Sequence, residues 1–168
     1  MDKAHSLSSP MVVRSLDLEK DPFGPKKPDE DMLGPEIPYL SAIGALMYLA
    51  SHTRPDISFA VSLLSRFSSC PTLRHWNGIK HLFRYLQGTP DLGLFYTDRP
   101  SEKMAGYADV GYLSNPHNAR SQTGYVFIHG GAAVSWRSTK QTLEATSSNH
   151  AEIIAMFEAS RELVWLGI

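Results

Sequence analysis

The hydrophobic pattern of this 168-residue chain changes its period near Gly88, and that change limits the folds open to it. Before Gly88, apolar residues recur at intervals of three and four, which is typical of helices that bury one side. After Gly88, short segments rich in aromatic and β-branched residues alternate with Gly, Asn and Pro, which is typical of strands joined by turns. A last helical pattern follows. The sequence therefore predicts an α+β chain.

Three helices are predicted before the change of period. The first stops before Pro55, which suits the first turn of the second, and Gly88 is placed to end the third. Their periodic apolar positions are Leu40, Ile43, Leu46 and Ala50 in the first, Ile57, Val61, Leu64 and Phe67 in the second, and Trp76, Ile79, Phe83 and Leu86 in the third.

Four strands and one helix are predicted after the change. The strands are "LGLFYT" (92–97), "MAGYADVGY" (104–112), "QTGYVFIHG" (122–130) and "AAVSWRST" (132–139), and "HGGA" (129–132) is typical of a hairpin turn. Ser147 or Ser148 is expected to cap the last helix. Its apolar residues form a stripe of Ile153, Met156, Phe157 and Val164, together with Ser160.

The chain divides into three segments by composition. Residues 1–38 hold six prolines and are predicted to form a flexible arm. Residues 39–90 form the predicted helical segment, and residues 91–168 form the predicted sheet with one packed helix. The net charge is only -1, but the middle segment carries five Lys and Arg against one acid.

This basic bias gathers on the third predicted helix, in Arg74, Lys80, His81 and Arg84. One interpretation is an ordinary solvated face. The other is a surface that binds nucleic-acid phosphates, weakly and without regard to sequence, because Lys and Arg neutralise backbone charge without reading bases.

Asp109 and Glu152 are the candidate metal ligands. Asp109 lies in the second predicted strand, and Glu152 lies near the start of the last helix. Two carboxylates that converge can begin a Mg²⁺ site, because this hard cation prefers oxygen ligands. Turn chemistry for Asp109 and a helix-dipole role for Glu152 explain the same residues without a metal.

The remaining composition gives two expectations. Cys70 is the single cysteine, so no intrachain disulfide is expected. No signal peptide or membrane-spanning segment is recognised, which predicts no membrane insertion and a cytoplasmic or nuclear location.

Several long segments resemble copia-type retrotransposon polyproteins. "YLSAIGALMYLASHTRPDISFAVSLLSRF" and "HWNGIKHLFRYLQGTPDLGLFY" resemble the connection that follows the reverse transcriptase, and "KAHSLSSPMV" resembles the end of the reverse transcriptase itself. "GYADVGYLSNPHNARSQTGYVFIHGG" with "SSNHAEIIAMFEASRELVWL" resembles the start of the ribonuclease H domain. The resemblance implies a truncated ribonuclease H-like sheet.

The same resemblance assigns roles to the two acids. Asp109 matches the first ribonuclease H carboxylate and Glu152 the helix glutamate, while Gly111 and Tyr112 stand where the family usually has Asp and Trp. Mg²⁺ is the cofactor of the parent family, but its other ligands are expected beyond Ile168. We therefore expect at most weak metal binding, no cofactor and no catalysis. We also expect the strand of Asp109 to be an exposed sheet edge that promotes self-association.

A second resemblance suggests another role. The chain, including "MVVRSLDLEKDPF", is similar to copia-derived sequences named as secreted RxLR-type effectors of a downy mildew. Arg14, Ser15, Leu16 and Asp17 form a degenerate RxLR-like motif with Asp where Arg is expected. This alternative implies secretion into host plant cells, where the chain would contact a host protein to modulate defence or suppress cell death.

Overall fold

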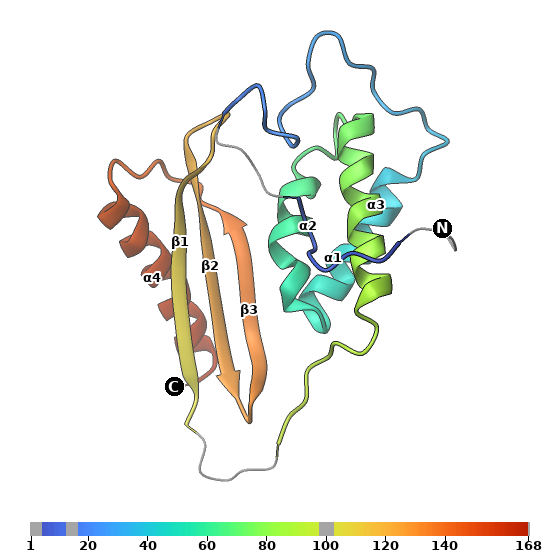
Figure 1. Ribbon diagram of the computed structural model, residues 1–168. Helices are drawn as coiled ribbons and strands as arrows, with labels where there is room; N and C mark the ends of the chain where they lie inside the picture. The colour runs from blue at the N-terminus through green and yellow to red at the C-terminus, as the bar shows by residue number, and fades with distance from the viewer. Residues whose placement is uncertain (1–4, 13–16, 98–102, 168) are drawn as a thin grey trace. The chain divides into compact units, whose positions relative to one another are not determined.

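The computed structural model describes residues 5–12, 17–97 and 103–167 (Figure 1). The chain forms two compact units, Met1–Gly93 and Leu94–Ile168. The first unit is helical and the second holds a three-stranded sheet with one helix, so the α+β class is confirmed. None of the helices within the described ranges is long and apolar enough to cross a membrane.

The first unit contains α1 (Tyr39–His52), the short 3-10 helix η1 (Pro55–Ile57), α2 (Ser58–Ser65) and α3 (Leu73–Gly88). Pro55 occupies the first turn of η1, where its missing N–H costs no hydrogen bond. Three helical segments were predicted here, and the structure confirms them.

The core of the first unit is built from all three α-helices. Leu46, Ile57 and Leu82 are completely buried in it, and the hydroxyl of Tyr39 donates to the Leu64 carbonyl at 2.8 Å. The predicted positions Ile43, Ala50, Val61, Leu64 and Ile79 are buried, whereas Leu40 is exposed because Tyr39 takes its place. Trp76, Phe83 and Leu86 pack at the margin of this core.

The proline-rich arm has no regular secondary structure between residues 17 and 38, yet it contributes to this core. Phe23 is only 4% exposed and belongs to the same hydrophobic cluster as Leu64. A Cβ on Gly78 of α3 would lie only 2.7 Å from the Phe23 ring, so the absence of a side chain there lets the arm approach the helix.

The second unit contains β1 (Ala105–Asn115), β2 (Arg120–His129), β3 (Ala132–Lys140) and α4 (Ser148–Trp165). The strands form an antiparallel sheet in the order β1-β2-β3, which leaves β1 as an edge of this sheet. The predicted hairpin turn is confirmed, since Gly130 and Gly131 both have positive φ between β2 and β3.

The predicted strand at residues 92–97 is wrong. These residues form no ladder with the sheet. Only the last two of them are held to the β2–β3 hairpin. Thr97 N–H donates to the Gly130 carbonyl at 2.8 Å, and the Tyr96 hydroxyl donates to the Ala133 carbonyl at the same distance. A single backbone hydrogen bond to a turn carbonyl does not continue a strand.

Helix α4 packs on the sheet through small side chains. Ser147 caps it by accepting from the N–H of His150, as expected, and Ala151, Ala155 and Ala159 are buried against the strands. Spaced four apart, these alanines lie on one side of the helix. They allow a close approach to the rings of Tyr125 and Phe127 on β2, with which Ala159 clusters.

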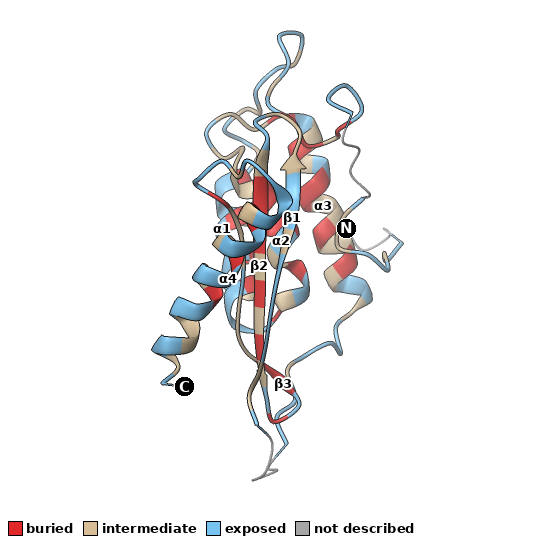
Figure 2. Cartoon of the chain, turned by 90° about the vertical axis from the view of Figure 1, so that its left-hand side faces the viewer, coloured by how far each residue is buried: buried red, intermediate tan, exposed pale blue. Residues whose placement is uncertain are grey.

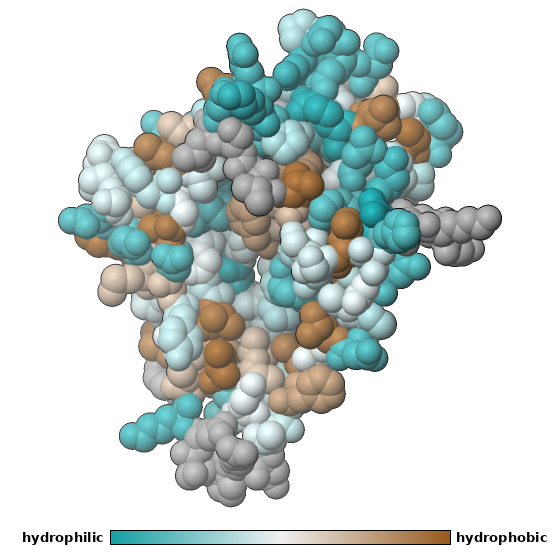
Figure 3. All heavy atoms as spheres, viewed as in Figure 1, coloured by the Kyte–Doolittle hydropathy of each residue, from teal (hydrophilic) through white to brown (hydrophobic). Residues whose placement is uncertain are grey.

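The apolar stripe predicted for the last helix lies on the opposite side of α4. Phe157 and Val164 are 61% and 75% exposed, and Ile153 and Met156 are exposed as well. Figure 2 shows α4 mostly in the colour of exposed residues, and Figure 3 shows hydrophobic side chains reaching the surface there. The stripe is therefore not the face that packs on the sheet.

Gln141 ties α4 to the sheet. It is fully buried, and its Nε2 donates to the Thr123 hydroxyl and to the Ala151 carbonyl, both at 3.0 Å. One amide thus connects the middle strand to the first turn of α4.

Replacement of glycine by alanine should have opposite effects on stability at two positions inside helices, Gly44 and Gly78. Gly44→Ala in α1 adds a methyl group where nothing lies within 4 Å, so the free energy of unfolding should rise by about 0.5–1 kcal/mol through helix propensity. Gly78→Ala places a Cβ 2.7 Å from the Phe23 ring and 2.8 Å from Leu64. Overpacking of this kind costs about 1–3 kcal/mol, so stability should fall. Urea unfolding of both variants measures the difference, and a stabilised Gly78→Ala would contradict the packing of the arm.

Candidate functional site: two acidic residues and a basic helix

Asp109 lies in the middle of β1, paired with Gly124 of β2. It is not at a strand end, so the turn interpretation is wrong. Its neighbour Val110 pairs with Thr123, whose hydroxyl is bound by Gln141 on the side that faces α4. Paired residues share a face and successive residues alternate, so Asp109 lies on the face turned away from α4.

Glu152 follows the buried Ala151 on α4 and is exposed. The register therefore does not bring Asp109 and Glu152 together across the contact between α4 and the sheet. Within the part of the chain that the structure describes, no three His, Cys, Asp or Glu side chains form a group that could hold a metal ion. A metal shared by the two acids stays a prediction without a geometric basis here.

The basic residues predicted on α3 do lie along one side of the helix, but the arm contacts them. Arg84 Nε donates to the His5 carbonyl at 2.8 Å, and His81 Nε2 donates to the Ser9 carbonyl at 2.9 Å. Lys80 is partly exposed beside them.

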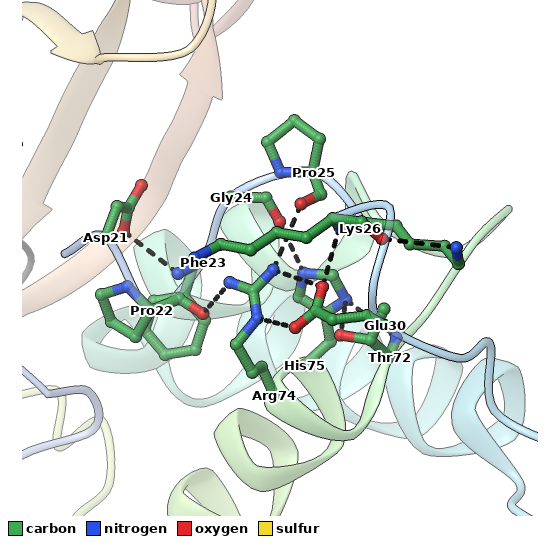
Figure 4. Close-up of polar contacts among 11 residues, drawn as sticks. Asp21, Pro22, Phe23, Gly24, Pro25, Lys26, Glu30, Thr72, Arg74 and His75 are labelled. Atoms are coloured by element: carbon green, nitrogen blue, oxygen red, sulfur yellow. Dashed lines mark hydrogen bonds and ion pairs between the residues drawn. The ribbon is translucent and has the colours of Figure 1, made fainter. Parts of the chain in front are cut away.

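Arg74, the first of these residues, is held by the arm at three points (Figure 4). Its Nε and Nη2 donate to the two carboxylate oxygens of Glu30, the second at 2.8 Å. Nη1 donates to the Pro22 carbonyl at 2.9 Å, and Nη2 also reaches the Pro25 carbonyl at 3.2 Å. The hydrogen bonds from Arg74 lower the pKa of the Glu30 carboxyl to about 2, so the pair stays ionised at neutral pH.

His75 joins the same contact from inside the unit. The backbone N–H of Thr72 donates to Nδ1 at 3.0 Å, so the proton of the neutral ring is on Nε2, which donates to the Gly24 carbonyl at 2.9 Å. The ring is completely buried and stacks on Phe67 at 4.1 Å between centroids. Burial lowers the pKa of His75 below its usual range.

The sequence pattern predicted no role for Glu30 or His75. The spacing Thr72-x-x-His75 is that of a capping box with His in place of Glu, and it was the one local signal for His75. Glu30 carries no local signal because its partner lies 44 residues away.

The RxLR-like motif is only partly visible. Arg14, Ser15 and Leu16 lie outside the described residues. Asp17 is exposed, pairs with Lys20 at 3.3 Å and accepts from the N–H of Glu19.

The chain is similar to a protein named as a secreted effector and to proteins named as retrotransposon Pol polyproteins. It is 46% identical to the secreted RxLR effector protein 161 of Plasmopara viticola over 79% of this chain and 93% of that protein. It is 42% identical to the retrovirus-related Pol polyprotein from transposon TNT 1-94 of Nicotiana tabacum, and 38% identical to that from transposon RE2 of Arabidopsis thaliana. These matches cover 78% and 76% of the chain but only 10% and 9% of the polyproteins. No protein-family model and no solved structure matches the chain.

Protonation of His75 predicts a pH-dependent stability. In the unfolded chain His75 has a pKa of about 6.5, so as the pH falls it takes up a proton at a higher pH than the folded residue does. The free energy of unfolding should therefore fall as the pH is lowered from 7.5 to 5.5, a window in which Glu30 stays charged. His75→Gln should be less stable at pH 7.5 but show a shallower fall, and His52→Gln, the same change at an exposed histidine, is the matched control. Urea unfolding at each pH tests this, and equal slopes for wild type and His75→Gln would contradict it.

Proposed function

The chain belongs to the family of copia-type retrotransposon Pol polyprotein sequences, and from this membership we propose that it is a non-catalytic Pol-derived module whose helix α3 binds nucleic-acid phosphates. The observation that carries the proposal is the charge of α3. This helix holds Arg74, Lys80 and Arg84 and no acidic residue. Such a surface attracts any phosphate backbone without reading its sequence.

The absence of catalysis is proposed from the two acidic positions. The register turns Asp109 away from the helix that carries Glu152. Gly111 and Tyr112 also stand where the family usually has Asp and Trp. Mg²⁺ gives up its water reluctantly and needs several well-placed oxygen ligands, so two separated carboxylates support weak binding at most.

A second function is favoured by the similarity to the Plasmopara viticola protein, which this chain covers almost completely. Under this alternative the chain is secreted into plant cells and acts through contact with a host protein. Arg14, Ser15, Leu16 and Asp17 would supply the export motif.

The nuclease prediction concerns the chain by itself. With Mg²⁺ present, we expect no cleavage of a labelled RNA–DNA hybrid by the wild type, and the same result for Asp109→Asn. Gel analysis of the hybrid after incubation measures this. Mg²⁺-dependent cleavage that disappears in Asp109→Asn would overturn the proposed absence of catalysis.

The binding prediction concerns salt. Association with a fluorescein-labelled single-stranded RNA should weaken steeply as salt rises, because each neutralised phosphate releases counterions. In Lys80→Gln the slope of log affinity against log salt should become shallower by about 0.7. Lys103→Gln loses the same charge outside α3 and should keep the wild-type slope. Fluorescence anisotropy between 20 and about 200 mM salt tests this. Binding that ignores salt, or no binding at low salt, would refute the proposal.

The effector alternative predicts an effect in leaf tissue. Expression of the chain beside an inducer of cell death should reduce necrosis relative to an unrelated protein of similar size. Ion leakage from the tissue measures the extent of death. Unchanged leakage at equal protein level would count against the effector function.

A further inference from the structure

The basic side chains of α3 form a continuous stripe. Arg74, His81 and Arg84 are seven and three residues apart, so they lie on one side of the helix, and we call these three residues the basic stripe. At a rise of about 1.5 Å per residue, the ten residues between its ends span about 15 Å. The stripe is long enough to contact several consecutive phosphates.

Every member of the basic stripe is bound to an oxygen of the arm. Arg74 binds the Glu30 carboxylate, His81 binds the Ser9 carbonyl and Arg84 binds the His5 carbonyl. The arm also returns a bond, since the N–H of Leu7 donates to the Arg84 carbonyl at 3.3 Å. Oxygen acceptors of the arm thus occupy at least one side-chain donor of each stripe residue, and phosphate oxygens would need the same donors.

The charges of the two partners are complementary. Residues 1–38 carry eight acidic and five basic side chains, whereas α3 carries three Lys and Arg and no acid. Figure 3 shows a hydrophilic surface where the arm loops above the helices in Figure 1. An acidic segment on a basic helix reproduces the electrostatics of a polyanion on that helix.

The contact between the arm and α3 is incompletely packed. A pocket of about 300 Å³ lies between them, lined by Pro22 and Phe23 of the arm and by Arg74, Asn77 and His81 of the helix, among others. The contacts from the arm to the stripe side chains are polar, whereas Phe23 is buried against Gly78 and Leu7, Met11 and Leu33 of the arm pack against the hydrophobic core. Polar contacts exchange for phosphate contacts at a small net cost, while Phe23 keeps the arm tethered nearby.

We propose that the acidic arm is an autoinhibitory cover of the basic stripe, and that nucleic-acid phosphates and the arm compete for the same side chains of α3. This inference rests on the proposed nucleic-acid binding and adds its regulation. The arm is part of the same chain, so its local concentration at the stripe is high, and the measured affinity is lowered by the fraction of molecules in which the stripe is covered.

The first test repels the arm from Arg74. In Glu30→Lys the pair becomes two like charges, whereas Glu19→Lys makes the same change of charge at an exposed position of the arm. Anisotropy with labelled single-stranded RNA should show Glu30→Lys binding at least threefold tighter than Glu19→Lys. Salt-dependent binding by both variants with equal affinity overturns the cover and leaves the proposed function standing. No binding by any variant at low salt overturns both.

The second test uses the wild-type chain and does not depend on a variant that folds. Competition is reciprocal, so RNA that takes the stripe must loosen the arm. Hydrogen–deuterium exchange in residues 5–12 and 17–30 should become at least threefold faster when saturating RNA is added, while exchange in α1 stays unchanged. Arm exchange that is unchanged or slower with RNA bound overturns the proposal.

Discussion

Two consecutive side chains at the start of α3, Arg74 and His75, determine where residues 22–30 of the arm lie. The buried imidazole needs an acceptor for its Nε2 proton, and the Gly24 carbonyl supplies it. The guanidinium has five donors, and the arm supplies a carboxylate and two carbonyls to them. Because these acceptors lie within nine residues, the two side chains fold the arm over the helix. The placement of Phe23 on Gly78 follows from this anchoring.

The sequence predicted what is local in the first unit and missed what is distant. The helices follow from the spacing of Ile43, Leu46 and similar residues, which acts over a few turns. The basic side of α3 was likewise a local pattern. Its cover was not predictable, because Glu30 and Gly24 are 44 and 51 residues away from Arg74 and His75. A proline-rich composition predicts an extended chain, but it does not report on single anchors such as these.

In the second unit, the apolar stripe of α4 was predicted correctly as a pattern, but the pattern did not say which side of the helix packs on the sheet. The large side chains at Ile153, Phe157 and Val164 are exposed. The sheet offers Tyr125 and Phe127, which already fill the space between the layers, so the helix must present small residues to them. Ala151, Ala155 and Ala159 meet that need. Large residues on the sheet and small ones on the helix complement each other in volume.

The same packing fixes the face on which Asp109 lies. Phe127 pairs with Gly106, and a Cβ on Gly106 would lie 2.5 Å from its ring, so this position on β1 accepts only glycine. A slip of one residue would bring Tyr107 or Ala105 against Phe127 and would turn every side chain of β1 to the other face. The register is therefore held by Gly106, and Asp109, three residues further on, must point away from α4. The resemblance suggests that Asp109 descends from a metal ligand. Side chains alternate between the two faces of the sheet along β1, and the place of Asp109 in this alternation decides which residues it can reach.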